Sequence, residues 1–490
     1  MKALLRSIVT DREGVAPLRL RLMRGVFYSS LSSVFAQGIG FATTIATARI
    51  LGSSGFGIFG LVTTTVATAG LFAGMGLGLT LTRHLAALRD EQPQRAGTQL
   101  GLGLLVALVS GGSYAAALFL LAEPLALWVL HTPQLAGYLR VAALQLLFAT
   151  GSGVMLGALS GLESFRDVAI GNCVKAMINM VALPGAALLW GVEGAVVGST
   201  AGAALGFAVD SLVLRRALRS WGIRLRFHGI RAEVGVLRNF TLPAFLASAM
   251  VGPGVWAAAA ILANQPQGYA ALGVFTMALT FQRLLQTVAA IVDTSLLPLL
   301  CSREGRGSDR LQRLNVLATW IVGSVVAVPL LALPEVIGWV GGPDYGGERA
   351  RQTLALVVLF TCIGIYKQGL TRALVAEGKM WWAFLSGLQW ALALIGGTWV
   401  LTRYGLGEVG LALAYTLTWA TNIVLFVPLY QRLRLVPPNV VVSWEAFVVW
   451  SVMSMLAALA FFDVPIIDRL VLAGLAAALL YLQFQRLIKN

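Results

Sequence analysis

The chain has 490 residues, of which 58% are hydrophobic and only 12% charged, and its mean hydropathy is +0.81. A soluble protein of this length needs about a quarter of its residues charged, so the composition excludes a soluble enzyme or binding domain. The net charge of +15 does not indicate nucleic-acid binding, because the basic residues lie between apolar segments, as the positive-inside rule requires. The composition indicates an integral membrane protein with several spans.

Apolar segments long enough to cross a membrane follow one another along the chain, since a helical span needs about 20 residues. We count fourteen, at residues 25–51, 56–82, 98–121, 138–162, 169–190, 192–214, 239–263, 268–300, 314–341, 352–375, 381–402, 406–430, 444–462 and 466–486. The N-terminal residues 1–24 lack the apolar core and cleavage site of a secretory signal, and their alternation of apolar and basic residues predicts an amphipathic segment on the membrane surface. We therefore predict an all-α integral membrane fold.

The basic residues between these segments predict the orientation. Counting from a cytoplasmic N-terminus, 26 of the 36 Lys and Arg residues lie in the cytoplasmic loops and termini and six in the opposite loops. This bias predicts that both termini are cytoplasmic. No loop exceeds about 25 residues, so we expect no separate soluble domain.

A weak internal repeat predicts how the spans are grouped, because residues 238–275 resemble residues 24–61. In both stretches an Arg opens a helix with polar residues, and a turn with Gly and aromatic residues leads into the next helix. Two parallel repeats would enclose a central cavity near the midplane of the bilayer. We expect an N-lobe at 25–214, a basic inter-lobe loop at 215–238, a C-lobe at 239–430 and two extra helices at 444–486.

Enzyme and metal chemistry have no support in the sequence. The three cysteines, Cys173, Cys301 and Cys362, form no CxxC pair, the three histidines are scattered, and no phosphate-binding GxxxxGK[ST] loop occurs. We expect no catalytic residue, no metal site and no cofactor.

Four basic residues lie inside the predicted spans: Lys175, Arg283, Lys367 and Arg372. A charge in the bilayer core costs roughly 2.5–3.5 kcal/mol or more, so such residues are candidates for function. Arg283 lies about 13 residues, or about 20 Å, from the periplasmic end of its span, too deep to reach that surface. We predict that it faces the protein interior and binds phosphate or glycan; the alternative is a structural arginine in a salt bridge or bonded to carbonyl groups.

Other polar residues extend this candidate binding set. Asn172, Lys175 and Asn179 form a stripe on one helix face, although such stripes also join helices by hydrogen bonds. Lys367 shares a face with Thr371, and Arg372 is near enough to the cytoplasmic end to extend toward it.

The first span offers Ser29, Ser33 and Gln37 at helical spacing, with Thr44 further along. These side chains can bind sugar hydroxyl groups, or they can pack helices closely. Gln145, Gln389 and Asn422 are polar residues without a useful spacing.

Candidate ion-coupling residues are fewer. Asp293, Asp210 and Glu377 lie near the cytoplasmic ends of their spans, where a solvated helix end is the alternative to a proton relay. Coupling to H⁺ or Na⁺ is the only cofactor requirement that these residues suggest.

Three passages resemble a known family. They begin with "ATARILGSSGFGIFGLV" (46–62), "GALSGLESFRD" (157–167) and "ALVAEGKMWW" (373–382), and their order and spacing are similar to those of the polysaccharide-transporter branch of the multidrug/oligosaccharidyl-lipid/polysaccharide exporter superfamily. The resemblance covers about residues 20–435.

The resemblance implies a bacterial inner-membrane flippase. Its members move undecaprenyl-pyrophosphate-linked oligosaccharide repeat units of O-antigen or exopolysaccharide to the periplasmic leaflet, by alternating access of two lobes. It implies as partners the lipid-linked oligosaccharide, membrane lipids and glycan polymerase or export machinery, and we expect a monomer. The alternatives are a lipid II flippase, a cation-coupled multidrug exporter or, with less support, a membrane glycan polymerase or ligase.

Overall fold

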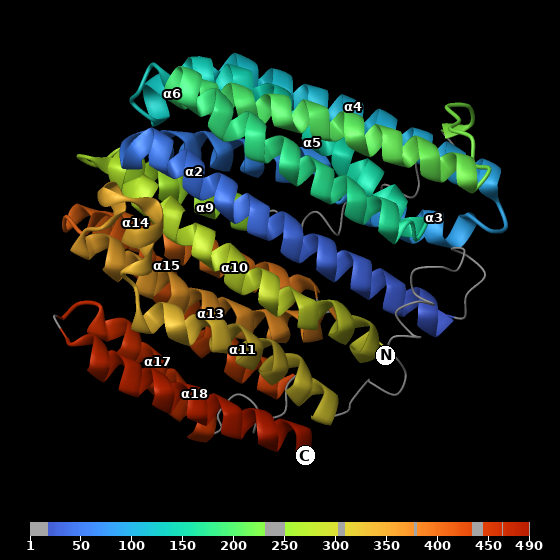
Figure 1. Ribbon diagram of the computed structural model, residues 1–490. Helices are drawn as coiled ribbons and strands as arrows, with labels where there is room; N and C mark the ends of the chain where they lie inside the picture. The colour runs from blue at the N-terminus through green and yellow to red at the C-terminus, as the bar shows by residue number, and fades with distance from the viewer. Residues whose placement is uncertain are drawn as a thin grey trace. The chain divides into compact units, whose positions relative to one another are not determined.

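A computed structural model describes the backbone of residues 18–230, 250–301, 309–376, 380–433, 444–462 and 464–489, and every regular element in these ranges is a helix (Figure 1). The predicted all-α membrane fold is confirmed. The α-helices are α2 (Leu18–Gly74), α3 (Leu77–Leu88), α4 (Pro93–Pro124), α5 (Leu135–Gly161), α6 (Phe165–Ser220), α9 (Val251–Ala263), α10 (Gly268–Cys301), α11 (Asp309–Ala332), α12 (Val336–Gly341), α13 (Glu348–Ala376), α14 (Met380–Arg403), α15 (Gly407–Arg432), α17 (Trp444–Leu459) and α18 (Ile466–Lys489).

Two of these helices are long enough for two spans: α6 contains the predicted spans 169–190 and 192–214, and α2 contains 25–51 and most of 56–82, whose last residues continue in α3 after a break at residues 75–76. α2 has 57 residues and α6 has 56, whereas a bilayer core of about 30 Å is crossed by about 20 residues. The backbone of α2 leaves helical geometry at Gly52 (φ 66°, ψ 177°), and that of α6 does so at Trp190 and Gly191 (φ 60°, ψ −134°). These breaks fall between the predicted spans, so the chain can turn back at both places.

Most of the remaining predicted spans fall on single helices, but 314–341 is divided between α11 and α12 by the non-helical residues 333–335. Nine helices in the described part of the chain are long and apolar enough to cross a membrane, and α9 and α17 are shorter apolar helices. The predicted span 239–263 is described only from residue 250 onward. Of the predicted surface segment 1–24 only residues 18–24 are described, and they already belong to α2.

The chain forms two compact units. The first consists of Met1–Thr43 and Val62–Ala249, and the second of Thr44–Leu61 and Met250–Asn490. The boundary therefore falls twice within α2, and the middle of this helix packs with the second unit. The inter-lobe loop predicted at 215–238 begins later than expected, because α6 continues to Ser220; residues 231–238 lie outside the described part.

The first unit is built on the antiparallel helices α3, α4, α5 and α6. α4 packs against α5, and α5 against α6, along their length (Figure 1). One continuous apolar core joins them, with Leu81 of α3, Leu100 of α4, Ala158 of α5 and Leu214 of α6 all buried. Ile223, which follows the end of α6, is part of the same core.

A glycine crossing holds the middle of α2 in the second unit. A Cβ atom at Gly57 would overlap the carbonyl oxygen of Tyr269, and one at Gly273 would overlap that of Ser53. Only glycine permits two helix backbones to approach this closely. Residues 53–60 of α2 therefore lie directly against the first turns of α10.

Polar contacts fix the turn between the first two spans. Arg49 donates from Nε to the Val340 carbonyl at 2.7 Å and from Nη2 to the Trp339 carbonyl at 2.9 Å. The Ser53 amide donates to Asp344 Oδ2 at 3.3 Å. Tyr345 is fully buried beside them, and burial, followed by the charge of Asp344, raises the pKa of its hydroxyl. The Tyr345 hydroxyl therefore stays protonated.

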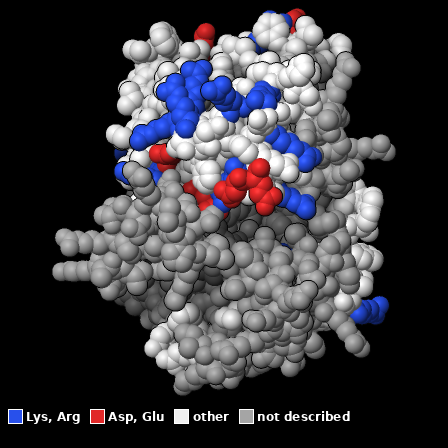
Figure 2. Space-filling model, turned by 90° about the vertical axis from the view of Figure 1, so that its right-hand side faces the viewer, with Lys and Arg blue, Asp and Glu red and all other residues white. Residues whose placement is uncertain are grey.

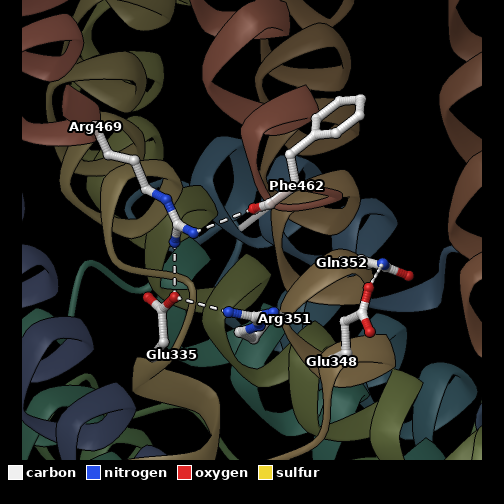
Figure 3. A network of polar contacts seen from close by, with 6 residues as sticks. All are labelled: Glu335, Glu348, Arg351, Gln352, Phe462 and Arg469. Atoms are coloured by element: carbon white, nitrogen blue, oxygen red, sulfur yellow. Dashed lines mark hydrogen bonds and ion pairs between the residues drawn. The ribbon is translucent and has the colours of Figure 1, made fainter. Parts of the chain in front are cut away.

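The two C-terminal helices are docked on the same unit. α18 packs against α11 and α17, and the Trp450 ring of α17 stacks on Trp320 of α11 with ring centroids 5.1 Å apart. At one end, Arg469 of α18 donates to Glu335 Oε1 at 2.7 Å, and Arg351 of α13 lies 3.4 Å from the same oxygen (Figure 3). The Arg469 side chain is almost fully buried. This ion pair ties α18 to the turn that precedes α12.

We expect Arg469→Met to destabilise the protein by about 3 kcal/mol, because it leaves Glu335 without its closest counter-charge in a largely buried site. Thermal unfolding of the purified protein in detergent measures the effect. The matched control is Arg140→Met, since the pair between Arg140 and Glu123 is solvent-exposed and should contribute less than about 1 kcal/mol. Equal losses in both variants would contradict a structural role for the Arg469 pair.

Candidate functional site

The two halves of α6 form a tightly closed hairpin. Glycines recur at every fourth position after its break, at Gly194, Gly198, Gly202 and Gly206. A Cβ at Gly194 would overlap the carbonyl oxygen of Ala186, and a Cβ at Gly202 would overlap the amide oxygen of Asn179. This row of glycines lets the second half of α6 lie directly against the first half.

The polar stripe predicted in span five lies along this seam. Asn179 faces Gly202, and the aliphatic part of Lys175 lies over Gly206, where an added Cβ would be 3.3 Å from its Cδ. Asn172, at the other end of the stripe, is half-buried. The stripe therefore faces the glycines of the same hairpin.

Lys175 is paired with Asp210 across the seam. Lys175 Nζ donates to Asp210 Oδ1 at 2.8 Å, and the two side chains are 18% and 2% exposed. Asp210 Oδ2 is buried and accepts no hydrogen bond from the described residues. The structure thus joins a predicted binding residue to a predicted ion-coupling residue, a pairing that the sequence reasoning did not foresee.

The polar residues of the first span lie on an open face of α2. Ser29, Ser33 and Gln37 are exposed, whereas Ser32 is buried and donates to the Ser29 carbonyl at 3.2 Å. Their hydroxyl and amide groups are available to a polar ligand.

Arg283 lies on a face of α10 that its own unit leaves uncovered. Its side chain is exposed, as is that of Gln286 almost one turn later, and the guanidinium makes no hydrogen bond or ion pair with any described side chain. The side chain of Asp293, the candidate partner, lies outside the described residues. A guanidinium with open donors can take a phosphate by paired hydrogen bonds.

Lys367 of α13 is enclosed by aromatic groups. Its ammonium donates to the Tyr430 hydroxyl at 3.1 Å and lies 4.5 Å from the centroid of the same ring and 5.3 Å from that of Phe426. The side chain is buried, and within the described part it meets no carboxylate. Cation–π contacts stabilise its charge here.

Arg372 joins α13 to α11. Its Nε donates to Asn315 Oδ1 at 2.8 Å, and its Nη2 donates to the Asn315 carbonyl at 2.8 Å and to Thr319 Oγ1 at 3.0 Å. Asn315 Nδ2 in turn donates to the Gly369 carbonyl at 2.7 Å. Arg372 is buried and so committed to helix–helix hydrogen bonds. Glu377, five residues further on, lies outside the described part.

Polar residues without a helical spacing form contacts between helices. Asn422 of α15 donates to Gln389 Oε1 of α14 at 2.6 Å and to the Ser386 carbonyl at 2.9 Å. Gln145 donates to the hydroxyls of Ser199 and Thr200 in the second half of α6. Spacing along one helix could not reveal these contacts, because each joins two helices.

Comparisons with known proteins identify the family of the chain and its fold. Residues 22–302 match the family model described as polysaccharide biosynthesis protein. The chain is 24% identical over 435 residues to the EPS I polysaccharide export inner membrane protein EpsE of Ralstonia solanacearum. This alignment covers 86% of the present chain and 94% of EpsE.

Solved structures share the fold. The lipid II flippase MurJ in an inward closed conformation aligns with a TM-score of 0.71 and 13% identity, covering 95% of this chain and 100% of that chain. An inward-facing multidrug resistance MATE family transporter aligns with a TM-score of 0.64 and 15% identity, and the alignment covers 81% of this chain and 94% of that chain. Since the family model spans more than half of the sequence, the chain belongs to the polysaccharide biosynthesis protein family.

Proposed function

We propose that this protein is a transporter that moves undecaprenyl-pyrophosphate-linked oligosaccharide repeat units from the cytoplasmic to the periplasmic leaflet of a bacterial inner membrane, by alternating access and without chemical change to the cargo. The observation that carries the proposal is the exposed Arg283 guanidinium, which lies on α10, the helix of the predicted span 268–300, and has no partner in the described part. The name of the Ralstonia relative, an export inner membrane protein for a polysaccharide, supports the same cargo class.

The position of Arg283 fits a phosphate carrier. It lies 15 residues after the first residue of α10, which is about 22 Å along a helix of 34 residues. An arginine at this depth is costly unless it meets water, a counter-charge or a ligand. A pyrophosphate supplies several acceptor oxygens in a geometry that a guanidinium matches.

The sugar part of the cargo needs neutral hydrogen-bonding groups. The open face of α2 supplies them through Ser29, Ser33 and Gln37. Hydroxyl and amide side chains both donate and accept hydrogen bonds, so they can replace the water around sugar hydroxyls. The polyprenyl tail can remain in the bilayer.

A lipid II flippase is the second candidate, because the solved structure of such a flippase covers 95% of this chain. Complementation separates the two functions. We expect the gene to restore surface polysaccharide in a strain that lacks its polysaccharide flippase, and not to restore growth in a strain depleted of its lipid II flippase. The opposite pattern would assign the chain to lipid II.

Arg283→Ala should abolish export of the surface polysaccharide, because it removes the donors that hold the pyrophosphate in the bilayer. The readout is surface glycan on whole cells, with the amount of protein in the membrane measured in parallel. Arg140→Ala is the matched control, since it removes an arginine that lies in an exposed ion pair with Glu123 at a helix end. Normal export by Arg283→Ala would remove this residue from the binding site.

Substitutions of the Lys175–Asp210 pair separate structure from function. Each single change, Lys175→Met or Asp210→Asn, should destabilise the protein by about 3–5 kcal/mol, because it leaves one charge buried alone. The double variant removes both charges and should recover most of the thermal stability. If Lys175 also binds cargo, the double variant is stable and still exports roughly tenfold less polysaccharide, which corresponds to about 1.4 kcal/mol. Export at the parental level would show that the pair serves folding alone.

A further inference from the structure

The chain that leaves α6 is held in a defined path along α4. After Gly222, which has a φ of 65°, residues 223–227 form no helix. The Arg226 amide donates to the Gly97 carbonyl of α4 at 3.3 Å, and Ile223 is buried in the core of the first unit. A Cβ at Gly97 or at Gly101 would overlap the carbonyl oxygens of Arg224 and Arg226, respectively. The two glycines therefore make room for the backbone of this segment.

The contacts with α4 also define the conformation of residues 223–227. The carbonyls of Arg224 and Arg226 lie against positions four residues apart in α4, which is about 6 Å of helix. Two residues that cover about 6 Å are nearly fully extended, so alternate side chains point to opposite sides. Arg224 and Arg226 thus share one side, and Leu225 and Phe227 share the side of Ile223. We call residues 223–227 the arginine strip.

The arginine strip exposes an unusual combination of side chains. Both arginines are exposed, and so are Leu225 at 41% and Phe227 at 59%. Between residues 211 and 230 there are five arginines and no acidic residue, whereas the turn before α4 carries the exposed acids Asp90 and Glu91. Figure 2 shows Lys and Arg side chains gathered on this end of the molecule, with a smaller group of acidic side chains beside them.

The position of the arginine strip matches the level of lipid head groups. It runs beside the first two turns of α4, where Pro93, Gln94 and Arg95 give way to an apolar span. Arg224 is next to Gly97, whereas the Phe227 ring lies beside Gly101, one turn deeper toward the span. The backbone of Arg224 therefore lies near the polar start of α4, and the Phe227 ring lies about one turn closer to the apolar part of that helix.

We propose that the arginine strip binds the head group of an anionic phospholipid in the predicted cytoplasmic leaflet. The phosphodiester accepts hydrogen bonds from Arg224 and Arg226, while the upper part of the acyl chains packs on Leu225 and Phe227. The positive-inside rule explains why arginines lie at this end, but it needs neither an ordered segment nor exposed apolar side chains beside them. This binding does not depend on which cargo the chain transports.

Native mass spectrometry of the purified full chain tests the proposal, with phosphatidylglycerol and phosphatidylcholine added to the detergent-solubilised protein. The protein should retain phosphatidylglycerol in preference to phosphatidylcholine. Arg224→Gln combined with Arg226→Gln should weaken this binding by roughly tenfold, because both phosphate donors are lost. The matched control is Arg215→Gln with Arg216→Gln, which removes the same charge from exposed positions at the same end of the unit and should leave binding within about twofold of the parent.

Three outcomes would overturn the proposal. An equal loss of phosphatidylglycerol binding in the two double variants would mean that the overall positive charge of this surface, rather than the arginine strip, binds the lipid. Unchanged binding in the Arg224/Arg226 variant would place the lipid elsewhere. Displacement of the lipid by inorganic pyrophosphate at low concentration would indicate a site for free phosphate. Because the only polar side-chain contact of Arg226 in the described part is with Gln94, both double variants should fold, and thermal unfolding verifies this.

Discussion

The cost of placing a charge among apolar helices governs the structure described here. Each charge in a span must find a counter-charge, a set of hydrogen-bond acceptors, an aromatic face or a ligand. Lys175 has a counter-charge in Asp210, Arg372 donates hydrogen bonds to Asn315, and Lys367 lies against the aromatic ring of Tyr430. Among the basic residues predicted within spans, only Arg283 has no counter-charge, hydrogen-bond acceptor or aromatic ring beside its guanidinium in the described part. This difference makes α10 the candidate site for a bound ligand.

The same constraint separates stabilising charges from functional ones. Arg372 and Arg469 are buried and form hydrogen bonds or ion pairs that join helices, so their removal should affect folding first. Arg283 and the residues of the open α2 face are exposed and contribute little to packing. Lys175 belongs to both groups, because it is paired and yet partly accessible. The proposed transport requires this combination, since rigid helical units would carry polar surfaces that bind cargo only for part of the cycle.

The sequence predicted the spans better than it predicted the site. Apolar runs of about 20 residues are a local property, and most of them fall on single helices where the backbone is described, although 56–82 and 314–341 are each interrupted by a short turn. The contacts of the site are not local: Lys175 and Asp210 are 35 residues apart, and Arg372 and Asn315 are 57 apart. The sequence does contain one indication of the Lys175 contact. The row of glycines from Gly194 to Gly206 predicts that this helix packs closely against a neighbour, which in the structure is the stripe that contains Lys175.

The central claim is that the face of α10 around Arg283 is lined by water and not by lipid. Cysteine accessibility in permeabilised membranes tests it directly, since a thiol reacts as its thiolate and the thiolate forms only in water. In a variant without the native cysteines, Arg283→Cys should react with a hydrophilic maleimide roughly tenfold faster than Leu392→Cys, an exposed apolar position on α14. Equal and slow reaction at both positions would place Arg283 against acyl chains and contradict the account.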